Sequence, residues 1–149
     1  MKTVRIISFF ALLALAACST GTKVNIPENV KVKVASLYPN VSPEWEMEDA
    51  NYEASFTQDN VETSVILSPD GNILQTETKW DVASLPPAVN DYVASQLGGK
   101  KIDAAEKIVD ANGMVSYEAE VDHTDYLFDE IGNFKSKEEP ESGENEDKD

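Results

Sequence analysis

The sequence predicts an α+β fold, built as two tandem copies of a helix that is followed by an antiparallel β-meander. Three observations indicate this fold. Short motifs recur in the same order in the middle of the chain, each copy opens with apolar residues at helical spacing, and the segments that follow alternate between apolar and polar residues. The first copy is expected to span residues 26–79 and the second residues 85–134.

The first residues are typical of a secretory signal. Lys2 and Arg5 form a short basic start, and Ile6–Ala17 is apolar except for Ser8. Such a stretch is too short to span a bilayer, and no stop-transfer pattern follows it. Residues 1–17 are therefore predicted to be a signal peptide.

Cys18 is the only cysteine of the chain, and it directly follows the small residues Ala16 and Ala17. This pattern resembles the lipobox of bacterial lipoproteins. The resemblance implies cleavage between Ala17 and Cys18 and attachment of lipid to the Cys18 thiol. Residues 19–25 are mostly small and polar, so residues 18–25 are expected to form a tether. The alternative is a plain signal peptide that leaves one free thiol, which is uncommon in an exported protein.

The middle of the chain repeats its own motifs. Three pairs of motifs match, namely Val34-Ala35-Ser36 with Val93-Ala94-Ser95, Tyr52-Glu53-Ala54 with Tyr117-Glu118-Ala119, and Gly71-Asn72 with Gly132-Asn133. Their order is preserved, while the offset between the two members of a pair varies between 59 and 65 residues. Insertions in loops produce such variation, so the motifs predict two copies of one structural unit.

Each copy is expected to begin with a helix. In the first copy, Pro27 suits an early helical position and Pro39 ends the segment. The apolar residues between these prolines recur at helical spacing, and they are Val30, Val34 and Leu37. In the second copy, Pro86-Pro87 begins the helix and Gly98-Gly99 ends it. Its apolar face is expected to carry Val89, Val93 and Leu97.

The segments after the helices alternate with a period of two, which is typical of an antiparallel sheet with one face on a core and the other in water. In residues 44–48, Trp45 and Met47 point to one face and three glutamates to the other, so Trp45 is expected in the core. Residues 115–121 alternate in the same way. Turn signals separate the strands, and Asn112-Gly113 is the strongest of them.

The water-facing side of the predicted sheets gathers acidic residues. We expect it to carry Glu44, Glu46, Glu48, Glu53, Glu106, Glu118 and Glu120. One hypothesis is that these residues form a docking surface for a basic protein patch, and the simpler interpretation is a solvated face that prevents association of strand edges. Trp80, between the two copies, is expected to be exposed as an interface anchor or to seal the copies together.

The charge of the chain excludes one class of partner. The sequence holds 12 Lys and Arg against 28 Asp and Glu, and residues 1–17 contain two of the basic residues and none of the acidic ones. The mature part therefore has a net charge of −18, whereas nucleic-acid binding needs a basic surface. A cationic partner would be attracted. Residues 135–149 contain no apolar residue and are predicted to be a disordered acidic tail.

No arrangement of residues indicates catalysis. His123, the only histidine, lies between two predicted strands, where an exposed turn is expected rather than a catalytic triad. Neither Asp110-Ala111-Asn112-Gly113 nor Asp70-Gly71-Asn72 has the spacing of a calcium loop, and the first is expected to form a hairpin turn. Zinc sites need clusters of His or Cys, which the sequence lacks. We expect no enzyme activity, no cofactor and no bound metal.

Taken together, several motifs resemble the PepSY-like, β-lactamase-inhibitor-like family of bacterial envelope proteins. They are an X-Pro at the helix start, Tyr38-Pro39, Trp45-Glu46, Tyr52-Glu53-Ala54 and Asp70-Gly71-Asn72. The resemblance covers nearly all of residues 26–134. It implies an α+β fold in tandem copies, export and no known catalysis, and some relatives are thought to inhibit or restrain secreted enzymes. The second copy departs from the pattern, because Gly98-Gly99 replaces the Tyr-Pro and no tryptophan follows.

The sequence therefore predicts a non-catalytic lipoprotein of the bacterial envelope that binds an envelope or secreted protein with a basic patch. Inhibition or restraint of that partner is the stronger form of this hypothesis. Ser19 after the cysteine is compatible with an outer-membrane lipoprotein, and the periplasmic side is favoured because no acidic run follows Cys18. The alternative, from another class of function, is an envelope sensor or buffer that binds a small ligand or a cation.

Overall fold

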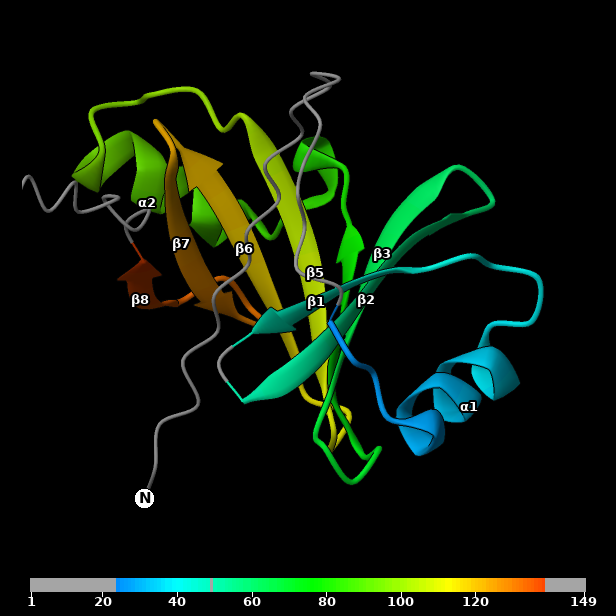
Figure 1. The fold of residues 1–149 in the computed structure, drawn as a ribbon. Helices are drawn as coiled ribbons and strands as arrows, with labels where there is room; N and C mark the ends of the chain where they lie inside the picture. The colour runs from blue at the N-terminus through cyan, green and yellow to red at the C-terminus, as the bar shows by residue number, and fades with distance from the viewer. Residues whose placement is uncertain (1–23, 49, 139–149) are drawn as a thin grey trace, which may run out of the picture. The chain divides into compact units, whose positions relative to one another are not determined.

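The computed structural model describes residues 24–48 and 50–138. Along the chain it contains α1 (Glu28–Leu37), β1 (Glu44–Glu48), β2 (Asn51–Gln58), β3 (Val61–Leu67), β4 (Ile73–Lys79), a short 3₁₀ helix (Val82–Ser84), α2 (Pro87–Gln96), β5 (Ala104–Asp110), β6 (Val115–Val121), β7 (Thr124–Asp129) and β8 (Phe134–Glu138) (Figure 1). The eight strands form a sheet in chain order, and two helices accompany it. The predicted α+β class with an antiparallel sheet is confirmed.

The two helices begin at prolines, as the sequence predicts. Pro27 precedes α1 and its carbonyl accepts hydrogen bonds from the amides of Val30 and Lys31. Pro87 is the first residue of α2, where its fixed φ suits the helix and its missing N–H is not needed. Gly98 and Gly99 follow α2 with positive φ angles, which glycine adopts without strain.

The chain divides into two compact units. Unit 1 consists of the described residues up to Lys79 together with Lys107–Val115, and unit 2 consists of Trp80–Glu106 and the described residues from Ser116 onward. The first unit therefore contains α1 and β1–β4, and the second contains α2, β7 and β8.

The core of unit 1 lies between α1 and one face of its strands. It is formed by Ile26, Val30, Val34, Ala54, Phe56, Val65 and Leu67. Trp45 packs against this cluster, as predicted from its alternation with glutamates. Leu37 was expected on the apolar face of α1, but it is 48% exposed, because the helix ends there and Tyr38 supplies the contact instead. The Tyr38 ring lies 4.7 Å from the ring of Phe56.

The core of unit 2 is formed by α2 and the strands beside it. Its buried residues are Leu85, Val89, Val93, Ile102, Ala105, Ala119, Val121 and Phe128. Leu97 is partly buried against this cluster, as predicted. An aromatic group extends the core toward β8, because Tyr92 stacks on Phe134 with ring centroids 4.7 Å apart and meets Phe128 edge-on at 5.4 Å.

Tight turns connect the strands. Asp59-Asn60 joins β2 to β3 and Asp122-His123 joins β6 to β7, and all four residues have positive φ angles. Two-residue turns of this kind match the twist of the strands that they join. The predicted hairpin turn at Asn112-Gly113 is confirmed, and there the Asp110 carboxylate accepts hydrogen bonds from the amides of Asn112 and Met114.

The C-terminal boundary of the predicted fold needs a correction. Residues 135–138 were expected to begin a disordered tail, but they form most of β8, which pairs with β7 from Asp125↔Glu138 to Phe128↔Phe134. Strand pairing uses backbone groups, so a segment without apolar side chains can join a sheet once a residue such as Phe134 anchors its start. The remainder of the predicted tail lies outside the described residues.

Candidate functional site

The exposed glutamates of unit 1 lie on the face of the sheet opposite α1. Residues that pair directly across strands share a face, and Trp45, Ala54 and Val65 pair on the side that packs against α1. Glu46 pairs with Glu53, and Glu44 pairs with Ser55, so these residues occupy the other side. We call Glu44, Glu46 and Glu53 the acidic face of unit 1. Glu44 and Glu46 are exposed, whereas Glu53 is half-buried.

The acidic face of unit 1 adjoins a set of buried polar groups on β3 and β4. The Ser55 hydroxyl donates to Glu53 Oε1 at 2.9 Å and lies 3.0 Å from the Ser64 hydroxyl, which is fully buried. Gln75 Nε2 donates to Glu77 Oε1 at 2.6 Å, and Glu77 is only 3% exposed. These hydrogen bonds hold the polar side chains in place, since a buried polar group without a partner would cost about 1–3 kcal/mol.

A second acidic group lies on the face of unit 2 opposite its apolar core. Glu120 pairs with Asp125, and Asp125 pairs with Glu138, so the three carboxylates stand side by side on β6, β7 and β8. We call them the carboxylate row. All three residues are half-buried. Burial and, to a smaller extent, the charges of Glu120 and Glu138 together raise the pKa of Asp125 from 3.8 to about 6.

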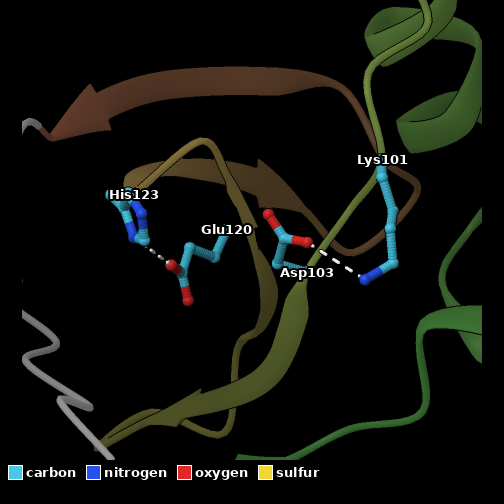
Figure 2. A network of polar contacts seen from close by, with 4 residues as sticks. All are labelled: Lys101, Asp103, Glu120 and His123. Atoms are coloured by element: carbon cyan, nitrogen blue, oxygen red, sulfur yellow. Dashed lines mark hydrogen bonds and ion pairs between the residues drawn. The ribbon is translucent and has the colours of Figure 1, made fainter.

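Basic residues near the carboxylate row form ion pairs at its margin. His123 Nδ1 lies 3.4 Å from Glu120 Oε1, and Lys101 Nζ lies 3.1 Å from Asp103 Oδ1 (Figure 2). The backbone amide of Asp103 donates to the carbonyl of Glu120, which places this second pair next to β6. Lys100 forms a further ion pair with Asp122. That pair raises the pKa of Lys100 and lowers the pKa of Asp122, mainly through their hydrogen bond.

The structure divides the predicted acidic surface into exposed and buried members. Glu44 and Glu46 are exposed, and Glu53 and Glu120 are half-buried. Glu106 and Glu118 were expected to face water but are buried, with Glu118 only 7% exposed. Alternation assigns a residue to a face, but it does not show how far side chains on adjacent strands shield one another. Glu48 lies on β1 opposite Asn51.

Trp80 is not an exposed anchor. It is half-buried, packs against the core of unit 2, and has its ring centroid 6.1 Å from that of Tyr117. Its indole N–H donates to the carbonyl of Ser84 at 3.3 Å, and its backbone amide donates to the carbonyl of Ala105. A tryptophan outside any helical or alternating pattern can therefore still pack against a hydrophobic core, and its neighbouring residues in the sequence do not indicate this. The predicted lipid site, Ala17 and Cys18, lies outside the described residues.

The position predicted for His123 is confirmed. His123 lies in the expected turn, with its side chain 90% exposed. Among residues 24–48 and 50–138, no group of three or more His, Cys, Asp or Glu side chains is arranged to hold a metal ion. None of the helices in this part of the chain is long and apolar enough to cross a membrane.

Sequence reasoning missed Asp125 and Glu138 as members of an acidic group. The first could have been found, because a two-residue turn at Asp122-His123 places Glu120 directly opposite Asp125. The second could not, because the pairing of β7 with β8 shifts register between Leu127 and Phe128. A bulge of this kind has no clear signal in a single sequence.

Solved structures with a similar fold come from Bacteroides species. A candidate periplasmic protein from Bacteroides eggerthii matches with a TM-score of 0.67 and 21% identity, over 76% of this chain and 88% of that chain. A BLIP-like protein from Bacteroides fragilis matches with a TM-score of 0.64 and 23% identity, over 83% and 93%. A DUF2874 family protein from Bacteroides uniformis gives 0.63 and 21%, over 75% and 88%.

These similarities concern the fold. The α+β architecture that the sequence predicts is confirmed by the match to the BLIP-like neighbour. No family model and no curated protein sequence matches the chain. The PepSY-like assignment and the lipoprotein assignment stay predictions.

Proposed function

We propose that this chain is a non-catalytic envelope lipoprotein that binds a basic surface of another protein through the acidic face of unit 1. The main observation behind this proposal is that Glu46 pairs with Glu53 and that the exposed Glu44 lies beside them. Like charges directly opposite each other on a sheet are unfavourable, so this arrangement costs stability in the free protein. A Lys or Arg from a partner would relieve the repulsion and replace it with attraction.

Two further properties support a protein partner. The Ser55 hydroxyl fixes the Glu53 carboxylate, so one acceptor of the face is already oriented before binding. The net charge of −18 on the mature part accelerates encounter with a cationic protein and repels an anionic one. Restraint or inhibition of the bound protein belongs to the same proposal, and the BLIP-like neighbour supplies the analogy.

The proposal includes the location and the arrangement of the chain. Cys18 would carry the lipid and anchor the protein in the outer membrane, with the folded part on the periplasmic side. The candidate periplasmic protein from Bacteroides eggerthii supports this location by analogy. In the proposed arrangement, the two helix-and-meander segments are PepSY-like copies.

The lipid anchor is tested by replacing Cys18 with Ser. This change should abolish incorporation of radiolabelled palmitate and release the protein from membranes, and continued labelling would refute the anchor.

The binding proposal is tested by capture from an envelope extract. Residues 19–149 should retain one protein in stoichiometric amount at low salt and less of it at moderate salt. The double variant Glu44→Lys/Glu46→Lys should lose at least about tenfold in affinity for that protein, since it replaces attraction with repulsion at two exposed sites.

The matched control is Asp91→Lys/Glu130→Lys, which changes the net charge equally at exposed positions of unit 2. It should retain most of the affinity. Equal losses in the two double variants would mean that net charge alone attracts the partner, and undiminished binding by the Glu44/Glu46 variant would exclude the acidic face as the site.

A further inference from the structure

The C-terminal edge of the described sheet is held at its two ends by different kinds of contact. At the start of β8, Phe134 stacks on Tyr92 and also approaches Phe128, with ring centroids 6.1 Å apart. At the other end, Glu138 stands opposite Asp125, which stands opposite Glu120. The first contact is apolar and independent of pH. The second places three carboxyl groups next to one another.

We infer that the end of β8 is a proton-dependent latch, which is held to β7 when the carboxylate row carries a proton and loosens when all three carboxyls are charged. The geometry carries this inference. Directly paired residues on a sheet have Cβ atoms about 4.5–5.5 Å apart, so three charges in one row repel across two strand pairs. A neutral carboxylic acid in the middle position removes the repulsion and can donate its O–H to either neighbour.

The charges that act on Asp125 are those of Glu120 and Glu138, and both raise its pKa. From β6 the facing group is Glu120, which has His123 beside it, and from β8 it is Glu138. Next to β6, Asp103 is paired with Lys101, and Lys100 is paired with Asp122. On β8, Lys137 pairs with Tyr126, which places it on the opposite face of the strand from Asp125. Asp125 is therefore flanked by carboxylates on both strands.

The direction and the range of the pH dependence follow from Asp125. Its pKa is raised from 3.8 to about 6 in the folded chain, so the folded state binds this proton more tightly than the opened state does. The stabilisation of the β7–β8 pairing by this proton is complete below pH 3.8, the ordinary pKa of the Asp125 carboxyl, and is lost as pH rises through about 6. Acidification from pH 7.5 to pH 5 should therefore tighten the β7–β8 pairing.

The test is hydrogen–deuterium exchange of the full chain, compared between wild type and Asp125→Asn at the same pH. Asparagine has nearly the shape of the neutral acid and cannot ionise. At pH 7.5 the variant should slow exchange of the β8 amides and their β7 partners by about tenfold, a factor that corresponds to one pKa unit. At pH 5 the difference between the two proteins should be smaller than at pH 7.5, and it should disappear only below the ordinary pKa of 3.8, where Asp125 is protonated in both the closed and the opened state.

Two further variants keep the test decisive. Asp91→Asn, at an exposed position of α2, should leave β7 and β8 unchanged at both pH values. Glu138→Gln removes one neighbour from the β8 side and should also slow exchange at pH 7.5. An equal effect of Asp125→Asn at pH 5 and pH 7.5, or no effect of either variant at pH 7.5, would overturn the inference.

Discussion

Unit 1 and unit 2 have similar apolar cores and different polar faces. In each unit, two valines of a helix are buried against strands, Val30 and Val34 in one and Val89 and Val93 in the other. On the opposite face, unit 1 has serine, glutamine and glutamate side chains joined by hydrogen bonds, whereas unit 2 has three carboxylates in a row. The comparison shows that one packing scheme accommodates two kinds of polar face, one with serine and amide groups that bind carboxylates and one with three carboxylates next to one another.

The two cores differ in their aromatic contacts, and this gives the largest expected effect. Phe128 is fully buried with Tyr92 and Phe134 around it, whereas Phe56 has Tyr38 as its ring partner and is 8% exposed. Replacement of Phe128 by Ala should cost about 4 kcal/mol of unfolding free energy, and replacement of Phe56 by Ala about 3 kcal/mol. Urea unfolding measures both. A larger loss of unfolding free energy for Phe56→Ala would mean that the aromatic contacts of unit 1 stabilise the chain more than those of unit 2.

The glycine turns provide a second comparison. Gly132 has φ +90°, and an added Cβ would lie 3.0 Å from the Cβ atoms of Pro86 and Ala88 and 3.2 Å from the Val89 amide nitrogen. Gly71 has φ +81°, and there the nearest atom is the amide nitrogen of the Asn29 side chain, at 3.1 Å. The first contact is rigid and the second is at the end of a flexible side chain.

Gly132→Ala should therefore destabilise by about 3 kcal/mol and Gly71→Ala by about 1–2 kcal/mol, the latter mostly from the positive φ. Thermal and urea unfolding of the two variants provide the measurement. Similar losses would mean that the turn of unit 1 is seated on its helix as rigidly as the turn of unit 2.

The carboxylate row predicts a gain of stability. Asp125→Asn should raise the unfolding free energy at pH 7.5 by about 1 kcal/mol, a value reduced for solvent screening because Asp125 is half-buried. The gain should be smaller at pH 5 and should vanish only below the ordinary pKa of 3.8, where Asp125 is protonated in both the folded and the unfolded chain. Urea unfolding at the two pH values measures it. A gain of the same size at pH 5 and pH 7.5 would contradict this prediction.

The ion pairs should give the smallest effects. Lys79 and Glu62 in unit 1 are 3.0 Å apart with exposed fractions of 56% and 28%, and Lys101 and Asp103 in unit 2 are 3.1 Å apart with 83% and 46%. Double-mutant cycles should give a coupling of about 0.5 kcal/mol for the first pair and about 0.2 kcal/mol or less for the second. The reverse order would show that burial does not govern these pairs.

Much of the fold was predictable because its signals are local. Prolines at the helix starts, valines at helical spacing, strict alternation in β1 and β6, and polar turn residues each depend on a few neighbouring positions. Leu37 was misplaced because the helix ends there and Tyr38 packs on Phe56 instead. Of the two positions considered for Trp80, the exposed one is wrong, because its ring packs beside Tyr117 from a distant part of the sequence.

The candidate site was predictable only in part. Alternation placed Glu44 and Glu46 correctly on the exposed side. It gave no warning that Glu106 and Glu118 are buried, since shielding depends on the strands to either side. The role of Asp125 depends on two strand registers, and one of these contains a bulge. The chemistry of a charged side chain therefore follows from pairings that a sequence pattern specifies incompletely.

The order of the strands has a consequence for how the chain reaches its native state. Each strand neighbours the next one along the sequence, and turns as short as two residues join β2 to β3 and β6 to β7. Contacts between consecutive hairpin strands require the closure of only small loops, which loses little chain entropy. A topology of this kind has low contact order and favours rapid folding. Successive hairpins can therefore form one after another as the polypeptide is released, before its last strand is available.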